Sequence, residues 1–69
     1  MTAKEAIEIV RQDYPDFELF NGMEIDIEKV VAYPSKDSDG RELMVFQYGK
    51  YLQARIYPKR YFDENDIRD

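Results

Sequence analysis

Residues 41–62 combine aromatic side chains with an excess of basic ones, which suits them to contact another molecule. This block contains five bases and one acid, whereas residues 1–40 contain four bases and ten acids. Six aromatic residues lie among these bases: Phe46, Tyr48, Tyr51, Tyr57, Tyr61 and Phe62. Aromatic rings beside cations can stack on nucleic-acid bases, and Tyr, Phe, Met and Arg are also enriched in protein interfaces. The block therefore predicts a contact surface for a single-stranded nucleic acid or for another protein.

The same sequence offers little for catalysis. It has no histidine and no cysteine, which removes the commonest general base and the only thiolate nucleophile. Its three glycines are scattered, so no glycine-rich phosphate loop is formed. A chain of 69 residues also has difficulty enclosing a pocket of several hundred cubic ångströms. We predict that the protein is not an enzyme and uses no cofactor or metal.

One short segment has the spacing of a metal loop. Asp37-Ser38-Asp39-Gly40 places two acids two residues apart before a glycine, as in part of a calcium loop. A loop in this register would begin at Ser35, and its twelfth position, where a bidentate Glu is required, would be Phe46. We therefore interpret residues 35–40 as a polar turn.

Composition predicts one small soluble domain over residues 1–69. No apolar run approaches the ~20 residues that span a bilayer, and residues 1–5 lack a basic region followed by an apolar stretch. The absence of cysteine fits a reducing cytoplasm, so we expect a cytoplasmic protein without membrane contact. Residues 63–69 contain four acids and one base, and we expect a short acidic tail there.

The clearest element is an N-terminal helix over residues 3–13. Thr2 and Glu5 have the spacing of a capping box, and Ala3, Ile7 and Val10 recur at helical intervals. Pro15 ends the helix because the residue before a proline avoids the helical region.

Residues 16–34 allow two interpretations. Asn21-Gly22 between residues 17–20 and 23–27 is typical of a tight hairpin turn, which would make both runs strands. The alternative for the second run is a short helical turn over residues 26–30. Residues 30–33 then favour an extended strand that ends at Pro34. This strand either continues residues 23–27 as one bent strand broken near residues 28–29 or forms a separate element.

The clearest strand pair covers residues 41–48 and 51–57. Gly49-Lys50 between them has the chemistry of a two-residue turn with glycine first. This turn would pair Tyr48 with Tyr51 and would place Leu43, Val45, Leu52, Ala54 and Ile56 on one aliphatic face under the helix.

The opposite face of this predicted hairpin would be aromatic. It would carry Met44, Phe46, Tyr48, Tyr51 and Tyr57, with Glu42, Gln53 and Arg55 among them. An apolar patch with a charged rim often marks a partner site. The predicted partner-binding residues are Phe46, Tyr48, Tyr51, Arg55 and Tyr57. The competing interpretation is that residues 17–33 or the C-terminal tail cover this face and make it core.

These elements predict an α+β fold in which the N-terminal helix packs on a three- to four-stranded antiparallel sheet. The predicted core is Ile7, Val10, Tyr14, Ile25, Ile27, Val31, Leu43, Val45, Leu52, Ala54 and Ile56. For function, we predict a protein-binding module that contacts either a second copy, as a homodimer, or a larger enzyme or regulator. The alternative is a domain that binds single-stranded nucleic acid through the hairpin.

The acids of the first forty residues suggest a more specific hypothesis. An acidic surface can occupy the basic groove of an enzyme that acts on nucleic acids. Small acidic inhibitors of phages and mobile elements are similar in size and charge, although no motif here matches one family. The competing interpretation is an ordinary solvated surface.

Overall fold

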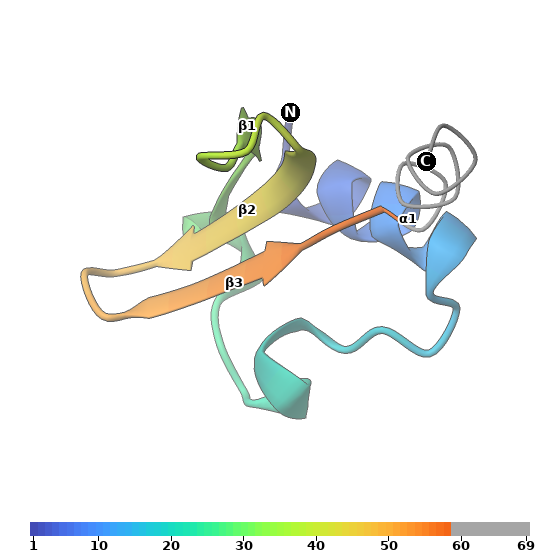
Figure 1. Cartoon of the computed structure of the whole chain (residues 1–69). Coiled ribbons are helices and arrows are strands. Elements are labelled where there is room, and N and C mark those ends of the chain that lie inside the picture. Colours follow the sequence, from blue (N-terminus) through green and yellow to red (C-terminus); the bar gives the residue numbers. More distant parts are fainter. Residues whose placement is uncertain (59–69) are drawn as a thin grey trace.

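The computed structural model describes residues 1–58 as one helix packed on a three-stranded antiparallel sheet (Figure 1). The helix α1 covers Ala3–Asp13, and the strands are β1 (Val31–Lys36), β2 (Glu42–Tyr48) and β3 (Leu52–Ile56), in the order β1-β2-β3. Two short 3-10 turns, η1 (Leu19–Gly22) and η2 (Ile27–Lys29), connect α1 to β1. The predicted α+β class is confirmed. The predicted acidic tail at residues 63–69 lies outside the described residues.

Helix α1 has the bounds and the caps that its sequence predicts. The Thr2 hydroxyl accepts a hydrogen bond from the Glu5 N–H at 3.2 Å, and the Thr2 N–H donates to Glu5 Oε1 at 3.0 Å. These two bonds lower the pKa of the Glu5 carboxyl below its usual value, and the bond from the Thr2 backbone has the larger effect. Ala3, Ala6 and Val10 form the buried side of the helix. None of the elements in residues 1–58 is a helix long and apolar enough to cross a membrane.

The predicted hairpin at Asn21-Gly22 is wrong. Residues 17–27 contain no strand, and Phe20, Asn21 and Gly22 instead have left-handed φ values of 52°, 58° and 75°. The successive residues Leu19 and Phe20 are both buried, which a strand cannot achieve on one face because its side chains alternate. Burial of two adjacent apolar side chains therefore favours the tight turn η1.

The alternative prediction for residues 26–30, a short helical turn, is confirmed as η2. Asp26 caps this turn, because its Oδ1 accepts a hydrogen bond from the Glu28 N–H at 3.2 Å. Ile25 and Ile27 pack against the core, whereas the alternating acids Glu24, Asp26 and Glu28 are exposed.

Strand β1 runs past the proline that the sequence interpretation took as its end. Pro34 pairs with Met44 inside the β1–β2 ladder. Proline is tolerated at an edge position whose missing N–H would point away from the sheet. The outer side of β1 also carries an isolated bridge between Thr2 and Val31.

The hairpin between β2 and β3 exists, but its predicted register is wrong by one residue. Tyr48 pairs with Leu52, so three residues, 49–51, form the turn, with Gly49 at a φ of 65°. Because side chains alternate with a period of two, this slip moves every β3 side chain to the other face relative to β2. Met44 and Phe46 therefore share a face with Ile56 and Ala54. This is the face that α1 covers.

Phe46 lies at the centre of the core with none of its surface exposed. The Phe17 ring lies 5.8 Å from the Phe46 ring, between centroids, and the Phe20 ring lies 6.5 Å from the Tyr48 ring. Of the predicted core, Val10, Leu43 and Val45 are buried, and most other members are half-buried against the main cluster. The prediction that Val31 belongs to the core is wrong, because 58% of its surface is exposed. The predicted core left out three large buried side chains: Leu19, Phe20 and Phe46.

We expect the Phe46→Ala variant to lose its cooperative fold. Truncating a buried Phe costs about 3–5 kcal/mol, which is comparable to the few kcal/mol that a domain of this size has in total. Urea unfolding followed by circular dichroism measures the change. The matched control is Tyr51→Ala, at a side chain that is 97% exposed, which should alter stability by less than ~0.5 kcal/mol. A Phe46→Ala protein as stable as the control would contradict the core described above.

Candidate interaction surface

The five residues predicted to bind a partner do not form one surface. Phe46 is fully buried under α1, and Tyr48 is half-buried on the same face. Tyr51 is exposed at the hairpin tip, Arg55 is exposed on the opposite face, and Tyr57 is half-buried just after β3. The prediction of a single aromatic face is therefore wrong, because it depended on the two-residue turn. Phe46 in particular belongs to the core and has no surface to offer a partner.

The face of the sheet that points away from α1 is the outer face. By register it consists of Val31, Tyr33 and Ser35 from β1, Leu43, Val45 and Gln47 from β2, and Gln53 and Arg55 from β3. Leu43 and Val45 are buried although they lie outside the main core cluster. Tyr33 and Arg55 flank Val45 in the ladders.

An apolar strip of the outer face remains open along β1. Val31 is 58% exposed and Tyr33 is 41% exposed, and both lie beside the central strand. The sequence contained the signal for this strip, since Val31 and Tyr33 alternate with Ala32. The predicted core includes Val31, and the strand register instead places Val31 on the outer face, beside Gln47.

The polar residues of the outer face form an ordered rim near the hairpin tip. Gln53 Nε2 donates to Gln47 Oε1 at 2.8 Å, and Gln47 Nε2 donates to the Gly49 carbonyl at 2.7 Å. These bonds link β3, β2 and the turn on one face. They fix the side chains that border the apolar strip.

The loop between β1 and β2 is organised by the Asp37 carboxylate. Asp37 Oδ1 accepts hydrogen bonds from the N–H groups of Asp39 and Arg41, each at 2.9 Å, and Oδ2 accepts one from the Tyr57 hydroxyl at 2.9 Å. The bond from the Arg41 N–H is the main cause that lowers the pKa of the Asp37 carboxyl. The hydrogen bond to Asp37, followed by desolvation, raises the pKa of Tyr57. This carboxylate therefore closes a turn, as the sequence interpretation predicted for residues 35–40.

Tyr57 is also held from the opposite side. The Tyr14 hydroxyl, just after α1, donates to the Tyr57 carbonyl at 2.6 Å. Tyr57 thus connects the end of β3 to both the helix and the β1–β2 loop. These two hydrogen bonds give Tyr57 a structural role.

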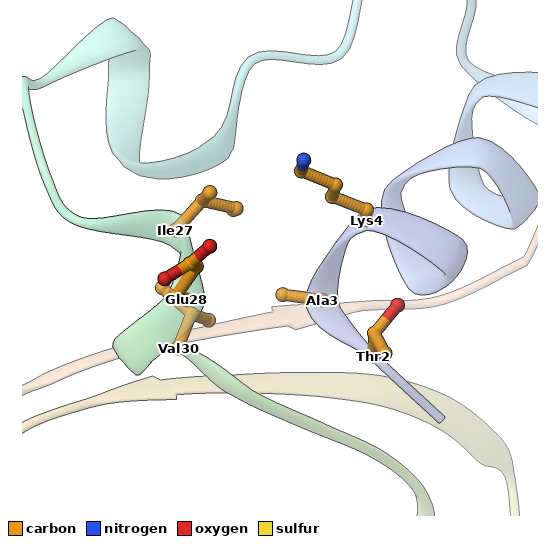
Figure 2. A pocket seen from close by; sticks show the side chains of 6 residues that line it. All are labelled: Thr2, Ala3, Lys4, Ile27, Glu28 and Val30. Carbon is orange, nitrogen blue, oxygen red and sulfur yellow. The ribbon is translucent and has the colours of Figure 1, made fainter.

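Figure 2 shows a hollow where the start of α1 meets η2. Its volume is about 350 Å³, and it is lined by Thr2, Ala3, Lys4, Ile27, Glu28 and Val30. Lys4 and Glu28 come from opposite walls, so the hollow has no excess of either charge. The Thr2 hydroxyl already caps the helix. The described residues contain no group of three His, Cys, Asp or Glu side chains that could hold a metal ion.

Comparison with protein-family models, with curated proteins and with solved structures finds no match for this chain.

We expect Asp37 to make the stability of the fold sensitive to acid. Its pKa is lower in the folded state than in the unfolded chain, so its carboxylate stabilises the fold above the unfolded pKa of about 4. This contribution is lost as the pH falls through the lowered folded value. Asp37→Asn should therefore be less stable than the wild type at pH 7, with a smaller loss of unfolding free energy between pH 7 and pH 2.

Asp39→Asn is the matched control for this experiment. Asp39 enters the turn through its backbone N–H, so its substitution should leave the acid response as in the wild type. Urea titrations at a series of pH values measure both variants. An acid response of Asp37→Asn equal to that of the wild type would contradict the assigned role.

Proposed function

We propose that the protein is a non-enzymatic protein-binding module that contacts its partner through the outer face. The observation that supports this most directly is the exposed apolar pair Val31 and Tyr33 on β1. Leu43 and Val45 of the central strand lie beside them but are buried. A continuous apolar strip on a sheet, bordered by polar side chains, is typical of an interaction site.

The chemistry of the strip favours a protein over a small molecule. Tyr33 and Arg55 lie on either side of Val45, and both residue types are enriched at the energetic centres of interfaces. The glutamines Gln47 and Gln53 form a neutral, hydrogen-bonded rim. A flat surface of this kind offers a partner contact area and excludes little water, which suits binding better than catalysis.

The alternative function, binding of single-stranded nucleic acid, receives less support. It requires several aromatic rings on one surface with cations between them. Here Phe46 is buried and Tyr48 lies on the core side, so Tyr51 and Tyr33 are left far apart on the tip and on the edge strand.

A second version of the proposal uses a different surface, the acidic segment 13–28, which contains six acids and no base and contributes no residue to the outer face. Glu24, Asp26 and Glu28 alternate in sequence at its C-terminal end, around the start of η2, and are exposed. Such a surface favours a basic partner, because opposite potentials steer association. An inhibitor that occludes the basic groove of a nucleic-acid enzyme is the form of this function that we propose from charge.

The outer face can be tested by site-specific photo-crosslinking. A benzophenone amino acid at position 33 should yield a discrete crosslinked protein in cells that express the chain. The same probe at Glu8, an exposed position on α1, is the matched control and should yield none. Equal products at both positions, or none at position 33, would overturn the proposal.

Once a partner is identified, two tyrosine variants separate the outer face from the hairpin tip. Tyr33→Ser should weaken binding by ~10-fold or more, as expected of an interface tyrosine, and Tyr51→Ser should change it by less than ~3-fold. Calorimetry measures both dissociation constants. The opposite order would assign binding to the tip.

A further inference from the structure

An apolar groove lies between the second half of α1 and the start of β2. Its volume is about 190 Å³. An apolar cavity of about 150 Å³ holds benzene, so this groove has room for one phenyl ring. Ile9 is 44% exposed, and Met44 and Ile56 are only half-buried, so the groove leaves apolar surface in contact with water. Most of the residues that line it are apolar or aromatic: Ile9, Val10, Tyr14, Pro34, Leu43, Met44, Ile56 and Pro58.

The charged members of this lining are two acids. Asp13 comes from the end of α1 and Glu42 from the start of β2, so both elements that form the groove contribute a carboxylate. Among the described residues that line the groove there is no base. The groove is therefore matched by an occupant that carries an apolar ring and, next to it, basic side chains.

The described part of the chain ends at this groove, because Pro58 is one of the residues that line it. The preceding residue, Tyr57, is fixed from two sides. Its carbonyl accepts a hydrogen bond from the Tyr14 hydroxyl at 2.6 Å, and its hydroxyl donates to Asp37 at 2.9 Å. Figure 1 shows the chain after β3 leading toward the second half of α1. The residues that follow Pro58 therefore start from the wall of the groove.

The sequence after Pro58 has the two properties that the groove requires. Residues 59–62 are two bases followed by two aromatic residues, Lys59, Arg60, Tyr61 and Phe62. Four residues span at most about 14 Å when extended, so both rings stay near the point where the segment starts. A short tether also gives an effective concentration in the mM range, so a weak contact is enough. Residues 63–69 contain four acids and one base and would be repelled by the carboxylates of the groove.

We propose that residues 59–62 close this groove within the same chain, with the Phe62 ring inserted between α1 and β2. Phe62 is the better occupant than Tyr61, because its ring has no hydroxyl that needs a hydrogen-bond partner at an apolar site. The two bases before the rings then lie near the two acids of the groove. Exposed ion pairs contribute little to stability, so the buried ring supplies most of the contact and the charges set its direction.

This contact goes beyond the proposed function and does not depend on it. The groove lies beside α1, whereas the proposed partner site is formed by Val31 and Tyr33 on the outer face. Its tests use the isolated chain and need no partner. Failure of one proposal therefore leaves the other intact, because a probe at position 33 does not report on the groove.

Methyl NMR of the full chain tests the contact directly. In the wild type, the Phe62 ring should show nuclear Overhauser effects to the methyl groups of Ile9 and Ile56, and Phe62→Ala should shift the signals of both. Ile27, which lies at the start of α1, is the internal reference and should not shift. Tyr61→Ala is the matched control variant. The wild-type spectrum should be the same at about 50 µM and at about 1 mM, because the contact is made within one chain.

Urea unfolding of the same variants gives a second, independent measurement. Phe62→Ala should raise the unfolding equilibrium constant by ~5-fold or more, and Tyr61→Ala should raise it by less than that. Because Ile9→Ala removes the other side of the same contact, its effect should be smaller by ~3-fold or more in the Phe62→Ala background.

Three results would overturn the proposal. The first is an absence of Overhauser effects between Phe62 and the groove, with methyl signals that Phe62→Ala leaves in place. The second is a set of groove signals that changes with concentration, which would assign the occupant to a second copy. The third is additivity of Ile9→Ala and Phe62→Ala, or a larger loss of stability from Tyr61→Ala than from Phe62→Ala.

Discussion

The burial of Phe46 is the constraint on which the other features of the fold depend. A chain of this length buries only about 60% of the surface that it exposes when unfolded, so it can complete one core and no more. Phe46 fills the centre of that core and has no exposed surface. For the ring to be enclosed, β3 must present Ala54 beside it, and the segment after α1 must bring Phe17 against it. The three-residue turn satisfies the first of these requirements.

The second requirement accounts for the unusual backbone of η1. Leu19 and Phe20 are adjacent and both buried, and the chain accommodates them by placing Phe20 and Asn21 in the left-handed region. This conformation costs a non-glycine residue about 1–2 kcal/mol, somewhat less for Asn. Full burial of a Leu or Phe side chain contributes about 1.5–3 kcal/mol, so burying the pair offsets the local strain.

The sequence predicted the elements that local chemistry determines. Helix α1 has its own caps, its own periodicity and a terminating proline, and its bounds agree with the structure. The hairpin register depends on more distant contacts. Residues 43–46 of β2 are all apolar, so alternation alone does not say which side of β2 faces the helix. The predicted site depended on the predicted register and was wrong for the same reason. Tyr51 and Arg55 are exposed, but Phe46 belongs to the core.

A single helix can cover only one face of the sheet, and the surface proposed for partner binding is the one that remains. On the outer face, Val45 of the central strand is buried, and its partners in the two ladders are Tyr33 and Arg55. Val31 and Tyr33 lie on the edge strand β1 and stay exposed, whereas Val45 lies between two strands. At the other edge, β3 pairs with β2 on one side, and residues 1–58 contain no strand on its other side. The proposed partner site therefore lies on the face of the sheet that the one helix of residues 1–58 does not cover.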